Sequence, residues 1–451
     1  MKQVYMDTFG CQMNVADSDR MELLLFHSGY ARTANVEEAD LILVNTCSIR
    51  EKAEQKIFSL FGNLKPLKRN NPGLVMGLTG CLAQQEGEVL LKKMPYLDFI
   101  LGPDAVERLP AAVERALSCR EPVVWTGFDR AKNYAIPEVE GEGPVNPGPS
   151  AFVNIVKGCD KFCSFCVVPF TRGREKSREA EEIYAEVRRL VARGAREIVL
   201  LGQNVNAYGK RGLDKPVAFH ELLYGVAGIP GVKRLRFTTS HPRDVTRDLV
   251  RAFRDIDALM DHLHLPVQSG NDRILDLMRR GHTAREYLDL VAELKSEVPD
   301  IALSTDIIVG FPGETAAEFE DTLELMERVG FDSSYLFAYS PRPNTPAAEF
   351  EDSVPEETKR ARLQKVIDLQ NRITLANGGK FLGREVDVLI EGRAARHGAH
   401  FKGRVPQYWL VNFSGGEDVL RPGDIVKVKT EEILGHVFKG RYAGQSTPNR
   451  Q

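Results

Sequence analysis

Three closely spaced cysteines are the residues with the clearest chemistry in this sequence. Cys159, Cys163 and Cys166 form a CxxxCxxC pattern in KGCDKFCSFC, directly after an apolar segment that predicts a strand. Thiolate sulfur favours iron–sulfur clusters, zinc or copper over magnesium or calcium. Three thiolates on one short loop can hold three corners of an iron–sulfur cubane and leave one iron free for a substrate. A zinc loop completed by a ligand from elsewhere in the chain is the alternative.

Three further cysteines follow a repeated pattern nearer the N-terminus. Cys11, Cys47 and Cys81 lie in FGCQMN, VNTCSIR and TGCLAQ, and each comes directly after a segment that predicts a strand. The loops that follow the strands of a doubly wound sheet lie along its carboxyl edge, so we expect the three thiolates to meet there and to suit a second cluster. Three separate buried cysteines that act as small apolar side chains are the alternative. Cys119 has no such partner, and we assign it no role.

The elements that must position these cysteines follow from the apolar pattern. Short apolar segments alternate with amphipathic ones and predict an α/β, doubly wound parallel sheet over 1–120, with strands at 3–8, 41–45, 74–78 and 97–101. Residues 121–150 are rich in Pro and Gly towards their end and predict a linker. Further strand candidates predict a partial (β/α)6 barrel within 151–377, with strands at 152–156, 197–201, 233–238, 262–266, 301–308 and 333–338. Alternating strands over 378–441 predict a small β-barrel, and 442–451 form a tail.

Length and composition limit the class of protein. The chain has 451 residues and exceeds the roughly 250–300 at which a single core stops growing, which favours several domains. Apolar residues at 43% and charged residues at 27% are typical of a globular protein. The N-terminus lacks the apolar core of a signal peptide, and no apolar run approaches the ~20 residues that cross a bilayer. We therefore expect a cytoplasmic protein with no membrane partner.

The charge is distributed unevenly along the chain. Residues 376–451 contain 12 Lys or Arg and 8 Asp or Glu, a net charge of +4, which leaves −7 for the remaining residues of a chain whose net charge is −3. A basic C-terminal surface that binds nucleic acid is one interpretation, and a β-domain that carries this charge by chance is the other.

The CxxxCxxC segment, with Phe165 before its last cysteine, resembles the radical S-adenosylmethionine (SAM) superfamily. The resemblance implies that the free iron binds the amino and carboxylate groups of SAM, whose reductive cleavage gives methionine and a 5′-deoxyadenosyl radical. Polar residues after several other predicted strands resemble the SAM pocket of this superfamily. With Phe165, the candidates for SAM binding are Gly202, Gln203, Asn204, Thr238, Ser240, Gln268 and Asp306. An ordinary turn or helix cap is the alternative for each of them taken alone.

The two groups of cysteines together resemble the methylthiotransferase family, and the resemblance covers nearly the whole chain. Members join a three-cysteine N-terminal domain, a radical SAM core and a C-terminal TRAM domain that binds RNA. The resemblance implies two [4Fe-4S] clusters, held by the six cysteines, of which the N-terminal one delivers sulfur. It implies no catalytic side chain beyond the cluster ligands. The segment GCQMNVADSDR is similar to the branch that adds a 2-methylthio group to N6-isopentenyladenosine at position 37 of tRNA.

The same resemblance implies the partners. They are tRNA, bound at its anticodon stem-loop, an electron donor such as flavodoxin, and a supplier of sulfur or of iron–sulfur clusters. The candidates for phosphate contacts in the TRAM-like segment are Lys402, Arg404, Lys439 and Arg441. Methylthiolation of a ribosomal-protein aspartate or of threonylcarbamoyl-adenosine in tRNA is an alternative activity. A non-catalytic iron–sulfur sensor that binds RNA is an alternative of another class, and it would not cleave SAM.

Overall fold

The computed structural model describes most of the chain, namely 1–47, 51–119, 121–128, 134–137, 148–394 and 400–446. The chain divides into two compact units. The first comprises Met1–Asn146, Val156–Asp160 and Val167–Arg178, and the second comprises Pro147–Ile155, Lys161–Cys166 and Glu179–Gln451. The chain therefore passes between the units within the cysteine-rich segment. Residues 138–147 of the predicted linker lie outside the described residues.

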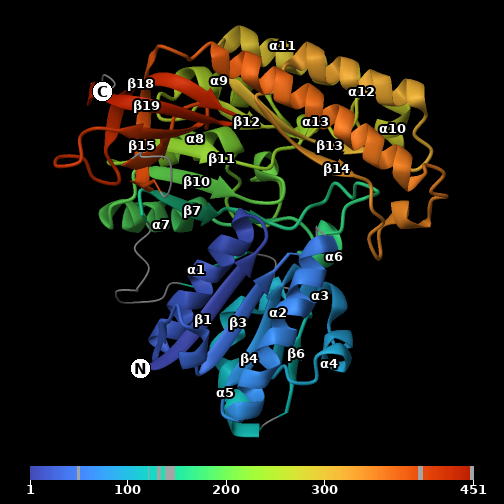
Figure 1. Cartoon of the computed structure of the whole chain (residues 1–451), viewed down its shortest axis with the longest axis vertical. Coiled ribbons are helices and arrows are strands. Elements are labelled where there is room, and N and C mark those ends of the chain that lie inside the picture. The colour runs from blue at the N-terminus through green and yellow to red at the C-terminus, as the bar shows by residue number, and fades with distance from the viewer. Residues whose placement is uncertain (48–50, 120, 129–133, 138–147, 395–399, 447–451) are drawn as a thin grey trace. The chain divides into compact units, whose positions relative to one another are not determined.

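The first unit is built around a parallel sheet in the order β2-β1-β3-β4-β5-β6 (Figure 1). Its strands are β1 (Lys2–Phe9), β2 (Tyr30–Arg32), β3 (Leu41–Thr46), β4 (Val75–Gly80), β5 (Phe99–Leu101) and β6 (Val123–Trp125). Its helices are α1 (Gln12–His27), α2 (Glu51–Asn70), α3 (Cys81–Glu86), α4 (Val89–Lys93), α5 (Leu109–Cys119) and the short α6 (Val168–Thr171). Two further short strands, β8 (Val156–Lys157) and β9 (Lys176–Ser177), pair with each other in an antiparallel manner.

Helices cover both faces of this sheet. Met21 and Leu25 of α1 pack with residues of α5 in one apolar cluster, and Ile57 and Phe61 of α2 pack with residues of α4 in another. The predicted doubly wound sheet is therefore confirmed. The structure adds β2 and β6, and β6 lies in the range that the sequence predicts as linker. Strands of three residues are too short to produce a clear period of two in the sequence.

The second unit contains a set of parallel strands that forms a partial barrel. The strands are β7 (Ser150–Asn154), β10 (Glu197–Leu201), β11 (Arg234–Phe237), β12 (His262–His264), β13 (Ala302–Val309) and β14 (Ser333–Ala338). They pair in the orders β11-β10-β7 and β12-β13-β14, and an isolated parallel bridge joins Leu235 of β11 to Leu259, which precedes β12. These strands match the predicted ones, so the partial (β/α)6 barrel is confirmed.

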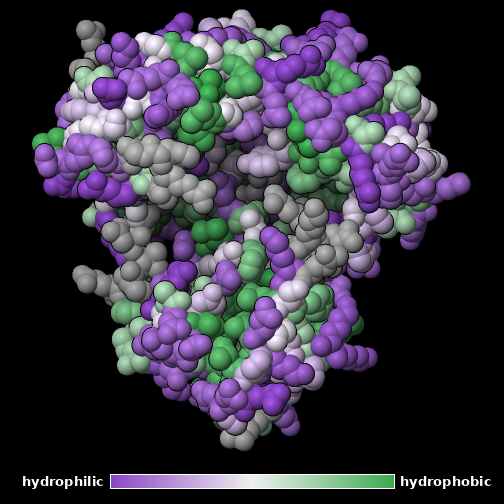
Figure 2. Space-filling view, viewed as in Figure 1, coloured by the Kyte–Doolittle hydropathy of each residue, from purple (hydrophilic) through white to green (hydrophobic). Residues whose placement is uncertain are grey.

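Helices follow the strands of this barrel and form its outer layer (Figure 1). They are α7 (Ala180–Ala192), α8 (Phe219–Ala227), α9 (Arg247–Asp255), α10 (Asp272–Leu277), α11 (Ala284–Glu297), α12 (Ala316–Val329) and α13 (Glu356–Gly379). Thr315 caps α12, and Glu318 completes a capping box with it. No helix in the described part of the chain is long and apolar enough to cross a membrane. Hydrophilic side chains cover most of the visible surface (Figure 2).

The C-terminal part of the second unit is a closed β-barrel. Its strands run in the order β15-β16-β17-β19-β18, with bounds β15 (Glu385–Arg393), β16 (Phe401–Arg404), β17 (Leu410–Ser414), β18 (Ile425–Leu434) and β19 (Val437–Gln445). Phe401, Trp409, Phe413 and Phe438 are buried in its core. The predicted small β-barrel is confirmed, and these aromatic rings are structural.

Two buried arginines of β11 hold the β-barrel against the partial barrel. Arg234 donates hydrogen bonds to the carbonyls of Arg404 (2.6 Å) and Asp387 (3.0 Å). Arg236 donates to the carbonyls of Pro406 (2.7 Å) and Val405 (2.9 Å), and its Nε lies 2.7 Å from Glu197 Oε2. Burial of these charges is tolerated because each guanidinium is surrounded by acceptors.

We predict that Arg236→Ala destabilises the second unit by about 3–5 kcal/mol, because Glu197 is left buried without its partner. Burial raises the pKa of Glu197, but Arg236, Arg234 and Ser150 outweigh that effect and hold it below its ordinary value. The stabilisation from this carboxylate is therefore complete at neutral pH and is lost as the pH falls through the lowered pKa. Urea unfolding at several pH values measures both effects. Arg254→Ala, which breaks a surface ion pair, is the control and should change little. An unchanged midpoint for Arg236→Ala would contradict the prediction.

Candidate functional site

The N-terminal cysteines lie at the carboxyl ends of three neighbouring strands. Cys11 follows β1 and is the N-cap of α1, Cys47 follows β3, and Cys81 is the first residue of α3, directly after β4. The order β1-β3-β4 in the sheet places the three residues along one edge. Cys47 and Cys81 are buried, whereas Cys11 is exposed. One edge of the sheet thus presents one solvent-accessible cysteine and two enclosed ones.

A buried amide network lies beneath this edge. The Asn14 Oδ1 accepts from the Cys11 N–H at 3.3 Å, and the Asn14 Nδ2 donates to Asn45 Oδ1 at 3.1 Å. Asn45 returns a hydrogen bond to the Asn14 carbonyl at 2.8 Å. Gly10 adopts a φ of +152°, and a Cβ there would lie 2.8 Å from the Cβ of Cys47. The loops that carry Cys11 and Cys47 therefore need a glycine at this position to approach each other.

The side chains that could bind a metal at this edge are the three cysteine thiols. Burial raises the pKa of the Cys81 thiol, and the nearby Arg172 guanidinium opposes that rise. In the part of the chain that the structure describes, no three His, Cys, Asp or Glu side chains gather closely enough to form a metal site. The assignment of Cys11, Cys47 and Cys81 as cluster ligands stays a prediction, supported by the chemistry of thiol donors on three neighbouring loops.

The CxxxCxxC segment lies between β8 and α6. The Cys159 N–H donates to the Gly173 carbonyl at 3.2 Å, and the Cys166 N–H donates to the Cys163 carbonyl at 3.0 Å. Gly158 has a φ of +72°, and a Cβ there would overlap the Arg174 carbonyl. The Arg280 Nη1 lies 3.4 Å from the Cys163 sulfur. Main-chain hydrogen bonds thus fix the backbone at Cys159 and Cys166, and the Cys163 sulfur accepts a hydrogen bond from Arg280.

The residues predicted to bind SAM occupy the carboxyl ends of the barrel strands. Gly202, Gln203 and Asn204 follow β10, Thr238 and Ser240 follow β11, Gln268 follows β12, and Asp306 lies on β13. Phe165 is partly buried against an apolar cluster that contains Ile274 and Phe311. The candidate residues that follow β10, β11 and β12, together with Asp306 on β13, therefore lie at one end of the barrel. The alternation of strands and helices in the sequence predicts this position.

Several buried polar atoms at this end lack a partner. Among the described residues, no hydrogen-bond partner is found for the Asn204 Oδ1, the Ser240 Oγ or the Gln268 Oε1. A buried polar atom without a partner costs about 1–3 kcal/mol, so a ligand that supplies the partners gains affinity. Gln268 also adopts a φ of +80°, a strained conformation for a residue with a side chain. These features fit a polar ligand such as SAM.

Asp244 organises this end of the barrel, and sequence reasoning missed it. Its side chain is 2% exposed and lies 2.7 Å from the Lys161 Nζ and 2.5 Å from the Lys210 Nζ. It also accepts from the Asn204 Nδ2 at 2.8 Å, which leaves the Asn204 Oδ1 as the acceptor that lacks a partner. Burial raises the pKa of Asp244, but these three donors outweigh burial and lower it. Asp244 thus attaches the CxxxCxxC segment, through Lys161, to the loop of Asn204.

Two buried histidines lie in loops near Asp244. The His241 Nδ1 accepts from the Arg243 N–H at 3.3 Å, and its ring meets that of His282 edge to face, with centroids 6.0 Å apart. The Nε2 of each histidine lacks a partner among the described residues. Burial and the charge of Arg280 lower the pKa of His282 to about 4. Burial and the charge of Arg280 also lower the pKa of His241 well below its ordinary value. Both rings are therefore neutral at physiological pH, and they add uncharged polar atoms to this region.

The predicted RNA contacts differ in their surroundings. Lys402 is exposed, and no ion pair of its side chain is found among the described residues. The Arg404 Nη1 lies 2.5 Å from Glu391, the Lys439 Nζ lies 3.8 Å from Glu432, and the Arg441 Nε lies 3.1 Å from Glu431. The pairs of Lys439 and Arg441 are exposed and cost little to break, whereas Arg404 and Glu391 are partly buried. Lys402 is thus the lysine of this set that is most available to a phosphate.

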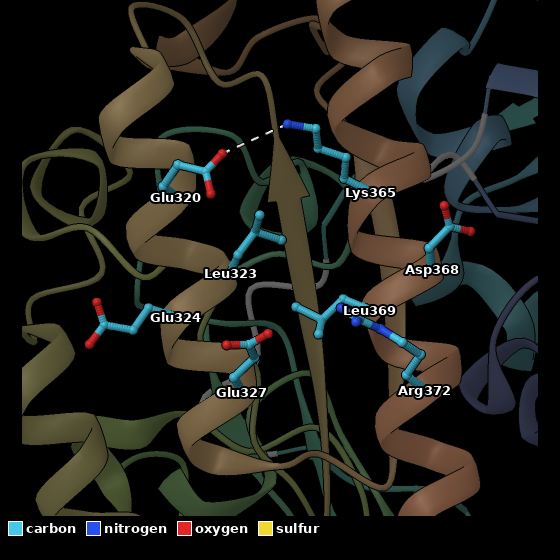
Figure 3. Close-up of a pocket in the computed structure, with 8 residues that line it drawn as sticks. All are labelled: Glu320, Leu323, Glu324, Glu327, Lys365, Asp368, Leu369 and Arg372. Carbon is cyan, nitrogen blue, oxygen red and sulfur yellow. Dashed lines mark ion pairs between the residues drawn. The ribbon is translucent and has the colours of Figure 1, made fainter.

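A surface groove between α12 and α13 contains none of the predicted site residues. Figure 3 shows its lining, which includes the ion pair of Glu320 with Lys365 at 3.8 Å. The other lining residues are Leu323, Glu324, Glu327, Asp368, Leu369 and Arg372. The chemistry predicted from the sequence lies at the strand ends and not in this groove.

Three family models match successive parts of the chain. "Radical SAM superfamily" matches residues 153–326, "Uncharacterized protein family UPF0004" matches 3–102, and "TRAM domain" matches 379–442. Curated proteins match nearly the whole chain. A Methylococcus capsulatus protein named tRNA-2-methylthio-N(6)-dimethylallyladenosine synthase is 46% identical over 98% of this chain and 96% of its own length. An Idiomarina loihiensis protein of the same name is 45% identical over 97% of this chain and 91% of its own length.

The chain belongs to this family of the radical SAM superfamily. Solved structures of more distant proteins share the fold. The radical SAM methyltransferase TsrM from Kitasatospora setae is 13% identical, with a TM-score of 0.55 over 77% of each chain. The radical SAM enzyme OxsB is 11% identical, with a TM-score of 0.50 over 82% of this chain and 56% of its own. Family membership implies SAM and a [4Fe-4S] cluster, which the thiols of the CxxxCxxC segment and the buried polar atoms fit.

We predict that Asp244→Asn weakens SAM binding about tenfold, or about 1.4 kcal/mol. The Asn side chain keeps one acceptor oxygen for three donors, so Lys161 and Lys210 lose their shared counter-charge and compete with the Asn204 amide for that oxygen. Equilibrium binding of SAM to anaerobically reconstituted protein, with iron content measured in parallel, checks this. Asp248→Asn is the matched control, because Asp248 is exposed and pairs only at the surface with Arg251. Equal SAM affinity of both variants with full iron content would contradict the prediction.

Proposed function

We propose that this chain is an enzyme that adds a methylthio group to carbon 2 of N6-isopentenyladenosine at position 37 of tRNA. The observation that carries this proposal is the near full-length likeness to proteins named tRNA-2-methylthio-N(6)-dimethylallyladenosine synthase, at 45–46% identity. The three matched family models support it, because each covers one part of the chain that the reaction needs.

The central step of this reaction does not depend on a catalytic acid or base of the chain at the barrel end. Carbon 2 of adenine bears an unactivated C–H bond, which side-chain acids, bases and nucleophiles do not readily replace with sulfur. SAM and its cluster, when bound, supply the radical that removes this hydrogen. The task of the chain is to bind and orient. We assign polar contacts with SAM to Asn204, Ser240 and Gln268, whose buried atoms lack partners.

The adenosine must reach the barrel end for this chemistry. A base inside the stacked anticodon loop is inaccessible, so the nucleotide has to leave the stack before it reacts. The neutral rings of His241 and His282 present polar atoms without fixed charge, which suits an uncharged nucleobase better than a phosphate. Phosphate binding then belongs to the basic TRAM domain, which we infer to contact the stem of the tRNA.

We infer a second cluster at the N-terminal sheet edge, held by Cys11, Cys47 and Cys81. The support is the position of all three at the carboxyl ends of neighbouring strands. A separate sulfur source is also needed chemically, because the radical removes only the hydrogen. The proposal further requires an electron donor such as flavodoxin and a supplier of sulfur or clusters. Since tRNA is the substrate, we expect the enzyme to act in the cytoplasm.

Two other classes of function, a methylthiotransferase with another target and a non-catalytic sensor, make different predictions. Methylthiolation of a ribosomal-protein aspartate or of threonylcarbamoyl-adenosine uses the same chemistry on another target, and the shared name of the relatives favours isopentenyladenosine. A non-catalytic iron–sulfur sensor would bind RNA without cleaving SAM. Mass spectrometry of tRNA nucleosides, together with an assay for 5′-deoxyadenosine, distinguishes the three. Loss of 2-methylthio-N6-isopentenyladenosine from the tRNA of cells that lack the protein is the expected result.

We predict that changing Cys11, Cys47 and Cys81 together to Ala separates radical formation from sulfur delivery. The variant should bind about four irons and cleave SAM under reduction, but it should form no methylthio product on tRNA that bears the isopentenyl group. The physical reason is that Cys159, Cys163 and Cys166 remain to hold one cluster. Iron content, 5′-deoxyadenosine and modified adenosine are measured on the same sample.

The matched control for this triple variant is Cys119→Ala. Cys119 is exposed and belongs to neither group of cysteines. Its variant should keep about eight irons and full activity if two cubanes are present. Normal methylthio product from the triple variant would exclude the sulfur-delivery role, and complete loss of SAM cleavage would exclude the division of labour.

We predict that Lys402→Glu lowers the affinity for tRNA about fivefold at low salt and has a smaller effect at high salt, where phosphate contacts contribute less. Deletion of the TRAM domain is a poor test, because it would bare the buried guanidiniums of Arg234 and Arg236. Lys365→Glu, in the groove between α12 and α13 (Figure 3), is the control with the same charge change. Filter binding over a salt series measures both. Equal losses for the two variants would argue against a phosphate contact at Lys402.

A further inference from the structure

A buried arginine after α10 lies against the CxxxCxxC segment. Arg280 is 5% exposed and belongs to the second unit, as does the stretch Lys161–Cys166 of that segment. Its Nη1 donates a hydrogen bond to the Cys163 sulfur at 3.4 Å, and its Nη2 donates one to the Pro266 carbonyl, shortly after β12, at 2.5 Å. The guanidinium therefore joins the end of a barrel strand to a cysteine sulfur.

The loops on both sides of this contact are fastened to each other. Ser164, the neighbour of Cys163, is fully buried. Its N–H donates to the Met278 carbonyl at 3.0 Å, and its hydroxyl donates to the Leu277 carbonyl at 2.7 Å. Both carbonyls lie within three residues of Arg280 in the sequence. The cysteine loop and the end of α10 thus hold the guanidinium and the sulfur in a fixed relation.

No carboxylate forms an ion pair with Arg280 in the part of the chain that the structure describes. Its side-chain acceptors there are the Cys163 sulfur and the Pro266 carbonyl, and its Nε lacks a partner. Arg362, another buried arginine of the second unit, donates instead to the Glu314 carboxylate at 2.6 Å. A buried cation without an anionic partner is costly. The Cys163 sulfur offsets that cost only where it carries negative charge.

Iron binding gives the sulfur this charge. A cysteine ligates a metal as a thiolate, and a [4Fe-4S] cluster held by three thiolates is an anion whose reduction adds one more negative charge. Hydrogen bonds to the sulfurs and positive charge beside them favour the reduced state. The geometry of Arg280 supplies both to one sulfur of the CxxxCxxC segment.

We propose that Arg280 is a positioning residue of the CxxxCxxC cluster: its guanidinium holds the Cys163 sulfur and raises the reduction potential of the cluster that this sulfur binds. The inference rests on the proposed function, in which Cys159, Cys163 and Cys166 hold the cluster that cleaves SAM. Reductive cleavage of SAM needs an electron from this cluster, so a higher potential allows a weaker donor to reduce it. Arg280 thus acts on the reaction through the cluster.

The experiment isolates this cluster in the full chain. Cys11, Cys47 and Cys81 are changed to Ala, so that the remaining iron belongs to the CxxxCxxC segment. Arg280→Met and Arg280→Lys are made in this background, and Arg279→Met is the matched control, because Arg279 is the adjacent residue and is exposed. Each protein is reconstituted anaerobically. Iron content, the electron paramagnetic resonance spectrum and the midpoint potential are measured without SAM, and SAM affinity and 5′-deoxyadenosine release are measured in parallel.

Each of these proteins should bind about four irons. Arg280→Met should shift the midpoint potential to more negative values, with an equilibrium constant for reduction about tenfold lower, which is about 59 mV for one electron. It should also alter the spectrum of the reduced cluster. Arg280→Lys should recover part of the potential, since it keeps the charge, and Arg279→Met should leave both readouts unchanged. Arg280→Lys keeps the test valid where Arg280→Met fails to fold.

Failure of the proposed function is distinct from failure of this inference. A background protein that binds no iron contradicts the proposed function and removes the inference with it. One that binds four irons but releases no 5′-deoxyadenosine contradicts the proposed function, whereas the comparison of potentials still decides the role of Arg280.

Three results overturn the role of Arg280 alone. The first is the same potential in every variant at full iron content. The second is a weaker SAM affinity of Arg280→Met at an unchanged potential, because the guanidinium would then act on SAM and not on the cluster. The third is an equal shift of potential in Arg279→Met, since any positive charge in this loop would then have the same effect.

Discussion

Parallel pairing of strands is the constraint on which both candidate sites depend. In each unit the strands of the α/β sheets run in one direction, so the loops after them emerge at one edge. The neighbouring strands β1, β3 and β4 deliver one cysteine each, and β10 to β13 deliver the polar groups around Asp244. Antiparallel strands would send alternate loops to opposite edges, and neither group could form. The chemistry is therefore concentrated by topology, before any individual side chain is considered.

This concentration has an energetic cost that the rest of the fold must offset. Asn204, Ser240 and Gln268 each bury a polar atom without a partner, at about 1–3 kcal/mol per atom. Asp244 adds a buried carboxylate, which Lys161 and Lys210 neutralise. The apolar residues of the strands, such as Leu200, Phe237 and Leu263, are fully or nearly fully buried and supply the opposing stabilisation. A ligand that satisfies the unpaired atoms then returns part of this cost as affinity, which links SAM binding to stability.

Local sequence patterns predicted the elements but not the contacts between distant residues. The strands of the partial barrel and the cysteine positions at strand ends follow from short-range periodicity, whereas β2 and β6 are too short to show it. Asp244 and Arg172 were missed because their partners Lys161 and Asp17 lie 83 and 155 residues away. The charge of the C-terminal segment predicted a basic surface, but it could not reveal that Glu432 lies opposite Lys439 in the register of β18 and β19. The pairs of Asp244 and Arg172 depend on tertiary structure, whereas that of Glu432 with Lys439 depends on the register of a local hairpin.

The TRAM domain is attached largely through main-chain carbonyls, whereas the two candidate sites depend on particular side chains. Arg234 and Arg236 of β11 bind main-chain carbonyls at residues 387, 404, 405 and 406. The ring of Tyr408 adds a side-chain contact, because it stacks on His262 with centroids 5.0 Å apart. Every residue has a carbonyl, and hence these four hydrogen bonds persist through substitutions at the acceptor residues as long as the backbone conformation persists. The surface that faces RNA is then free to change in sequence while its attachment is maintained. For the proposed function, this attachment fixes where the TRAM domain lies relative to the barrel strands, which is what a reaction at a single nucleotide requires.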